Sequence, residues 1–299
     1  MIRVFGAVLS PTIILVLLLS VPAAPLRAQQ EQGKRYDVAW LEYEAAEAAL
    51  RDRDYSEALR RYARALEIQP SFVEAYVSIA RAYRELGDLQ LAERYYRRAL
   101  EQRSQLQIPS EVYAIRLELA AMYDARRSGG NDFDRKYRNE LLHIIADDPT
   151  FSKDEPPRQR EAMRDVLLND GVNRVIILYR LDFPAATAAH RLYGRYLLEG
   201  SDSSAGIQAA EHFLFALVEI AGRAVTALID RRYDYEFTSL ADLYRTAAAF
   251  PAVLEYLDRE ELLTTLRELR SALASVPGDS TATAVESVDR EIRAIEALQ

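Results

Sequence analysis

The stretch Asp37–Arg103, DVAWLEYEAAEAALRDRDYSEALRRYARALEIQPSFVEAYVSIARAYRELGDLQLAERYYRRALEQR, carries one pattern twice at a spacing of 34 residues. Tyr55–Leu59 corresponds to Leu89–Glu93, and Arg61–Leu66 corresponds to Tyr95–Leu100. A fixed period of this length indicates stacked structural repeats. The two copies therefore predict two similar units that pack side by side.

Each unit is predicted to be a pair of helices joined by a tight turn. In the second unit, a helix from about Phe72 to Leu86 precedes Gly87-Asp88, where Gly tolerates a positive φ and Asp can cap the next helix. Small and large residues alternate at helical spacing, as dense packing requires. The predicted core positions are Tyr76, Ile79, Ala80, Tyr83, Ala92, Tyr96, Ala99 and Leu100, with Ala46, Ala58, Tyr62, Ala65 and Leu66 in the first unit.

These residues resemble the tetratricopeptide repeat family, which is built from helix pairs of this length. The matching positions are Ala80, Tyr83, Gly87, Ala92, Tyr96, Ala99, Ala46, Ala58, Tyr62, Ala65 and Pro70. Glu42 and Tyr76 stand where the family often has Trp, Arg53 replaces the turn glycine, and Ser104 replaces the closing proline. The alternative is a generic helical bundle with accidental periodicity. The resemblance implies an all-α, tetratricopeptide-like helical-hairpin solenoid of two clear and two degenerate repeats, followed by a C-terminal helical bundle.

The N-terminus has the pattern of a targeting segment. Arg3 gives a short positive region, Val4 to Val21 is mostly apolar, and Leu26-Arg27-Ala28 forms a small-residue site. These features predict a secretory signal peptide over residues 1–28, and the alternative is a retained membrane anchor. The following residues, 29–35, are polar and predicted to be flexible. The Ala-Gln-Gln junction is typical of bacteria and predicts the periplasm.

Composition narrows the classes of partner and cofactor. The formal charge is −8, which argues against nucleic acid and against an anionic membrane surface as partners. Membrane contact is expected only through an uncleaved signal segment. The chain has no Cys, which excludes disulfides, thiolate metal sites and a lipidated N-terminal cysteine.

Helical patterns continue after the two clear repeats. Residues 36–151 are predicted to form the repeat domain, Ser152–Arg158 a linker, and residues 158–299 a second helical domain. A third hairpin is expected at Glu111–Arg127 and Asp134–Ala146. The remaining predicted helices are Arg158–Asn169, Val172–Leu181, Pro184–Glu199 and Ile207–Asp230 (the last two a degenerate repeat), Phe237–Ala248, Pro251–Ser275 and a capping helix Ala282–Leu298.

The sequence shows no catalytic constellation. His143, His190 and His212 are scattered, and His212 beside Glu211 has no second ligand one helical turn later. Asp147-Asp148 is interpreted as a helix end. We therefore expect neither an enzyme, nor a metal site, nor a cofactor.

By the family resemblance, the inward surface is lined by the first helix of each unit. The candidate partner-binding residues are Trp40, Tyr43, Glu47, Glu74, Val77, Arg81 and Arg84. Aromatic and Arg side chains are common at binding hot spots, although Trp40 could instead cap the solenoid. The Asn and Lys set that clamps a peptide carboxylate in some family members is absent, because Val77 and Arg81 occupy matching positions.

These residues predict an exported scaffold that binds a protein partner on its concave face. The alternative is a periplasmic accessory protein that holds a small apolar ligand or solute in its C-terminal half and works with a transport system.

Overall fold

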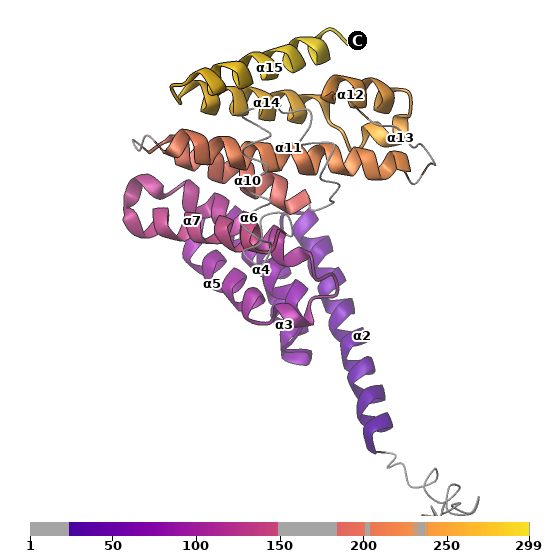
Figure 1. Cartoon of the computed structure of the whole chain (residues 1–299). Helices are drawn as coiled ribbons and strands as arrows, with labels where there is room; N and C mark the ends of the chain where they lie inside the picture. Colours follow the sequence, from indigo (N-terminus) through magenta and orange to yellow (C-terminus); the bar gives the residue numbers. More distant parts are fainter. Residues whose placement is uncertain are drawn as a thin grey trace, which may run out of the picture. The chain divides into compact units, whose positions relative to one another are not determined.

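The computed structural model describes residues 24–148, 184–200, 204–229, 231, 237 and 239–298. Every regular element in these ranges is a helix, so the predicted all-α fold is confirmed (Figure 1). The contacts divide the chain into two compact units, Met1–Pro109 and Ser110–Gln299. No helix in the described ranges is long and apolar enough to span a bilayer.

The first unit consists of two helical hairpins. Helix α2 (Ala24–Arg51) packs against α3 (Tyr55–Ile68), and α4 (Val73–Glu85) packs against α5 (Leu89–Glu101) (Figure 1). The bounds of α4 agree with the predicted helix to within one residue. The expectation of flexibility at residues 29–35 is wrong, because α2 runs through them. Gln, Glu, Lys and Arg, which dominate that polar stretch, are good helix formers.

The turn within each of the two hairpins ends in an Asp that caps the second helix. Asp54 accepts a hydrogen bond from the backbone N–H of Glu57 at 3.1 Å, and Asp88 accepts one from Leu91 at 3.0 Å. The residue before each cap has a positive φ, +80° at Gly87 and +60° at Arg53. Arg53 thus occupies the family's glycine position in a conformation that costs a non-glycine residue about 1–2 kcal/mol.

The core of the first unit follows the predicted alternation of small and large side chains. Ala58, Tyr62, Ala92, Tyr96 and Ala99 are all completely buried. Three residues predicted to lie in the core are only half-buried, so the prediction is wrong in part for them: Leu66, Tyr76 and Tyr83. Tyr83 instead stacks on Tyr95, with ring centroids 5.6 Å apart, beside the first repeat's apolar cluster.

The second unit is a series of packed hairpins around α11. It contains α6 (Glu111–Asp124), α7 (Asn131–Ala146), α10 (Pro184–Leu198), α11 (Ala205–Ile229), α12 (Leu240–Ala248), α13 (Pro251–Leu254), α14 (Arg259–Ala274) and α15 (Asp279–Glu296). Helix α10 packs against α7 and α11, and α11 packs against α14. As predicted, α11 is buried over most of its circumference.

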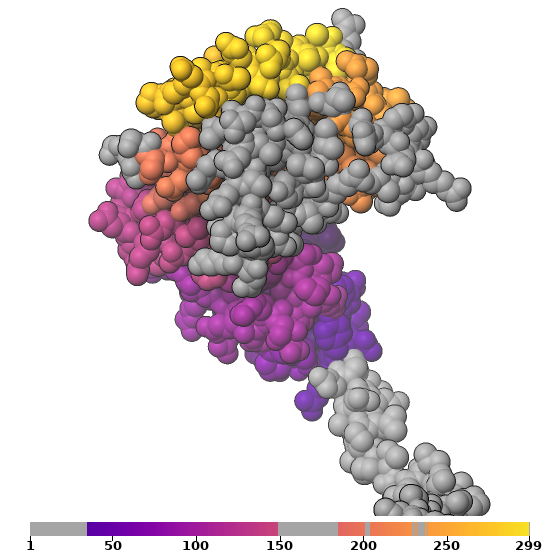
Figure 2. Space-filling model, viewed as in Figure 1, coloured from indigo at the N-terminus to yellow at the C-terminus, as the bar shows by residue number. Residues whose placement is uncertain are grey.

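The α10–α11 hairpin repeats the alternation of a small and a large residue. A Cβ atom added at Gly194 would come within 2.9 Å of the ring of Phe213, so only glycine fits beside this ring without a shift. Helix α15 buries one face and exposes the other, as the end of a solenoid requires. In Figure 2 the yellow residues of α14 and α15 form the upper surface of this unit.

One predicted helix of the second unit needs correction, and the predicted domain boundary stays a prediction. The single helix predicted over Pro251–Ser275 is two helices, α13 and α14, because Asp258 caps a new start by accepting from the N–H of Glu261 at 2.6 Å. The contact division also falls after Pro109, whereas the sequence placed the boundary at residues 152–158. The α6–α7 hairpin groups with the C-terminal helices because α7 packs against α10. The predicted linker and the helices predicted at 158–169 and 172–181 lie outside the described residues.

Candidate partner-binding surface

Hydrogen bonds join the first helices of the two repeats. The hydroxyl of Ser78 on α4 donates to Oε1 of Glu47 on α2 at 2.8 Å, and lies 3.1 Å from the hydroxyl of Tyr43. Tyr62 of α3 also donates to Oε1 of Glu47, at 2.6 Å. Glu47 therefore ties three helices together. The sequence identified Tyr43 and Glu47 but missed Ser78, whose partner lies 31 residues away.

Burial keeps both phenols of this network protonated. Burial, together with the nearby Glu47, raises the pKa of Tyr43 to about 12. Burial and the hydrogen bond to Glu47 raise the pKa of Tyr62 well above its usual value. Tyr62 therefore stays a hydrogen-bond donor at every physiological pH.

Trp40 belongs to an aromatic cluster near the middle of α2. Its ring stacks on Phe72 with centroids 5.7 Å apart and lies 5.3 Å from the ring of Tyr43. Tyr36 contacts the same Phe72 ring at 5.3 Å. A pocket of about 470 Å³ opens beside this cluster; it is lined by Tyr36, Asp37, Trp40, Leu41 and Gln107.

Gln107 closes this pocket from a distant part of the sequence. Its backbone N–H donates to Oε1 of Glu74 at 3.0 Å, and its side-chain amide donates to the hydroxyl of Tyr36. Glu74, predicted as a contact residue, therefore holds the segment after α5 in place. Nothing in the repeat pattern indicates this role for Gln107.

The remaining predicted contact residues lie on α4. Val77 is only 6% exposed, so it packs inside the repeat and offers a partner little surface. Arg81 and Arg84 are half-buried on the same helix. Among the predicted contact residues, the partly accessible aromatic and cationic ones are therefore Trp40, Tyr43, Arg81 and Arg84, and Val77 forms part of the wall.

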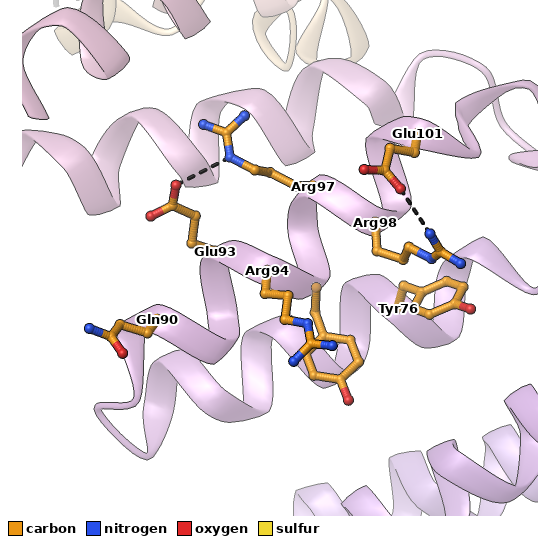
Figure 3. A pocket seen from close by; sticks show the side chains of 8 residues that line it. Tyr76, Gln90, Glu93, Arg94, Arg97, Arg98 and Glu101 are labelled. Carbon is orange, nitrogen blue, oxygen red and sulfur yellow. Dashed lines mark hydrogen bonds and ion pairs between the residues drawn. The ribbon is translucent and has the colours of Figure 1, made fainter. Parts of the chain in front are cut away.

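A second hollow lies over α5, as Figure 3 shows. It measures about 650 Å³ and is lined by Tyr76, Gln90, Glu93, Arg94, Tyr95, Arg97, Arg98 and Glu101. Arg97 pairs with Glu93 at 3.2 Å and Arg98 pairs with Glu101 at 3.1 Å (Figure 3). Because both acids already face an arginine, the hollow is a largely compensated, solvated surface.

The second unit contains a buried polar chain that the sequence did not reveal. Nδ1 of His190 lies 2.7 Å from Nδ1 of His212, and Nε2 of His190 lies 2.9 Å from Oδ2 of Asp148. The interpretation of these histidines as scattered is wrong. His190 and His212 lie equally far in sequence on either side of residue 201, so the pairing of α10 with α11 brings them together. That symmetry about the turn was the available signal.

This chain joins α10, α11 and the residue that follows α7 in the interior of the second unit. All three residues are buried, and only one hydrogen fits between the facing Nδ1 atoms. Burial, and secondarily the neighbouring His190, lower the pKa of His212 well below its ordinary value. Within the described ranges no three His, Asp or Glu side chains are grouped so as to hold a metal ion.

The hollow described in the second unit is polar. It measures about 580 Å³ and is lined by Asp134, Arg138, Tyr196, Leu197, Glu199, Gly200, Ala205 and Gln208. It lies at the turn end of α10, not along the apolar length of α11. It therefore gives no support to the alternative of a small apolar ligand held there.

Comparison with known proteins identifies the repeats. A family model described as tetratricopeptide repeat matches residues 49–120, which include α3, α4, α5 and most of α6. Residues 49–120 belong to the tetratricopeptide repeat family. Tetratricopeptide repeats are generally protein-interaction modules and not catalytic ones, so this part of the chain is a protein-interaction scaffold.

One solved structure with some similarity is the TPR2AB domain of yeast Sti1 in complex with an HSP90 peptide. Its sequence is 19% identical, and the alignment covers 87% of this chain and 99% of that one at a TM-score of 0.31. A similarity of this size carries no argument about function. No curated protein matches the sequence.

Proposed function

We propose that the protein is an exported scaffold whose tetratricopeptide repeats bind a protein partner on the surface of α2 and α4. The observation that carries the proposal is the hydrogen-bonded link from Tyr43 and Glu47 to Ser78. It fixes the two first helices relative to each other before any partner arrives. A preformed surface loses little conformational entropy on binding, and recognition needs no cofactor.

The accessible side chains support a mixed aromatic and polar contact. Trp40 and Tyr43 on α2 provide aromatic surface. Arg81 and Arg84 on α4 provide cationic groups. These residue types dominate the energy of protein interfaces. Glu47 and Glu74 have a structural role. Glu47 holds α4 in position through Ser78, and Glu74 holds the segment of Gln107.

The double variant Arg81→Glu with Arg84→Glu tests this surface. We expect it to weaken partner capture from the native cell envelope at least about tenfold, because it reverses two charges on α4. Crosslinking followed by mass spectrometry would identify the partner, and circular dichroism would check that the variant folds. The matched control is Arg94→Glu with Arg98→Glu, which makes the same charge change on α5. Unchanged capture by the α4 variant, or a loss confined to the α5 variant, would contradict the proposal.

Export rests on the sequence of residues 1–28. A positive start, an apolar run and a small-residue site support secretion to a bacterial periplasm. Cell fractionation with N-terminal sequencing of the mature protein tests this. A chain found in the periplasm and beginning at Gln29 is expected, and a cytoplasmic chain beginning at Met1 would contradict export.

A further inference from the structure

The outer side of α2 combines exposure with an apolar character. Val38 is 49% exposed and Leu41 is 64% exposed, and both are among the few large apolar residues that the described ranges leave open to solvent. Ile108, next to the pocket residue Gln107, is also 55% exposed. Exposed apolar groups that gather in one place usually mark an interaction site.

The spacing of these residues suits a packed helix. Val38, Leu41, Ala45 and Ala48 recur at three- and four-residue intervals, so they form one stripe along α2. The two alanines let another helix approach closely, and Leu41 also lines the pocket of about 470 Å³ beside Trp40. The stripe can pack against the apolar face of another helix, and the pocket beside Trp40 can accommodate one large side chain of that helix.

Two acidic residues flank Leu41 on this side of α2. Asp37 and Glu44 lie four residues before and three residues after Leu41, so they share its face of the helix. Both are exposed, and neither forms an ion pair within the part of the chain that the structure describes. By contrast, Glu42 on the same helix is paired with Arg61 at 3.2 Å. An occupant of this seam would therefore gain from positive charges beside its apolar residues.

We propose that the outer stripe of α2 is a docking site for an amphipathic helix of a partner protein, with Lys or Arg flanking its apolar seam and one large apolar side chain inserted beside Trp40. This site shares Trp40 with the α2–α4 surface, but its other residues, Asp37, Leu41 and Glu44, do not belong to those that join the two helices. It does not depend on the function proposed above.

Trp40 makes the test direct because it is the only tryptophan in the chain. The probe is a synthetic peptide of about five helical turns without Trp or Tyr, with Leu at helical spacing and Lys elsewhere. A second peptide carries Glu in place of each Lys. We expect the Lys peptide to shift the Trp40 emission to shorter wavelength, and the Glu peptide to leave it unchanged.

Four variants locate the effect. Leu41→Ser should raise the dissociation constant of the Lys peptide at least about tenfold, whereas Leu86→Ser, at a residue of similar exposure (50%), should leave it unchanged. The double change Asp37→Lys with Glu44→Lys should reverse the preference between the two peptides. Arg81→Glu with Arg84→Glu should leave peptide binding intact, so failure of either proposal is seen separately.

Several results would overturn the docking site. They are no emission shift with the Lys peptide, equal binding by the Leu41→Ser and Leu86→Ser variants, or no change of preference on charge reversal. A concentration-dependent dimer that Leu41→Ser abolishes, in the absence of peptide, would show that a second copy occupies the stripe. A Trp40 shift with zwitterionic lipid vesicles and none with the peptide would show a lipid surface instead.

Discussion

The repeats α2–α5 and the hairpin α10–α11 treat buried polar groups differently. In the repeats, Glu47 is half-buried and collects hydrogen bonds from Tyr62 and Ser78 near the surface. In the hairpin, His190 bridges Asp148 and His212 in the interior. Where the repeat period holds, alanines and tyrosines fill the core, and the buried Tyr62 and Ser78 donate to an acid that is only half-buried. Where the repeat period is lost, the chain of Asp148, His190 and His212 is buried, so its polar atoms must form hydrogen bonds with one another.

The largest expected effect tests the tyrosine core of the regular region. Tyr96→Ala should lower the free energy of unfolding by about 3–5 kcal/mol, because the ring is completely buried and its loss leaves a cavity. Urea denaturation measures this change. The half-buried neighbour Tyr95→Ala is the matched control and should cost clearly less. If Tyr96→Ala and Tyr95→Ala lowered the free energy of unfolding equally, the distinction between the packed core and the surface positions of the repeat would be contradicted.

The enclosed histidines should make the second unit sensitive to acid. The pKa of His212 in the folded protein is below its value of about 6.5 in the unfolded chain, so the unfolded state binds more protons below that pH. Stability should therefore fall as pH drops from about 6.5, by up to about 1.4 kcal/mol per pH unit from this group.

Two variants check the source of this pH dependence. His212→Gln should flatten the decline in the free energy of unfolding between pH 6.5 and 5, whatever it does to stability at neutral pH. His143→Gln should not, because His143 is exposed on α7. A slope that survives His212→Gln would remove the enclosed histidine pair as the cause.

The smallest expected effect concerns the two repeat turns. Arg53→Gly should raise the free energy of unfolding by about 0.5–1 kcal/mol, because glycine adopts φ near +60° without steric cost but is more flexible when unfolded. Gly87→Ala, at the equivalent turn, should lower it by a similar amount. Thermal melts would detect both shifts. A destabilising Arg53→Gly would mean that the arginine side chain, and not the turn geometry, matters here.

The sequence predicted the repeats well because their determinants are local. Ala92, Tyr96 and the Asp88 cap follow from helical spacing and turn chemistry within one unit. Of the predicted contact residues, Trp40 and Tyr43 are half-buried and Val77 is buried, and their role in binding a partner stays a prediction. Residue type alone cannot show how deep a position lies once neighbouring helices pack against it.

The sequence could not predict contacts between distant segments of the chain. Gln107 reaches Tyr36 across 71 residues and Asp148 reaches His190 across 42 residues. No periodic pattern links these positions, since each contact depends on where a loop or helix end arrives after folding. The pairing of His190 with His212 is the exception, because both lie on one hairpin.

Glu47 and Ser78 hold the neighbouring repeats together, and a double-mutant cycle tests this link most directly. Urea denaturation of Glu47→Ala, Ser78→Ala and the double variant gives their interaction energy. We predict a coupling of about 1 kcal/mol or more, as expected for a hydrogen bond to a charged group. Strictly additive effects would show that the two first helices are not joined at this point, and would contradict the preformed surface.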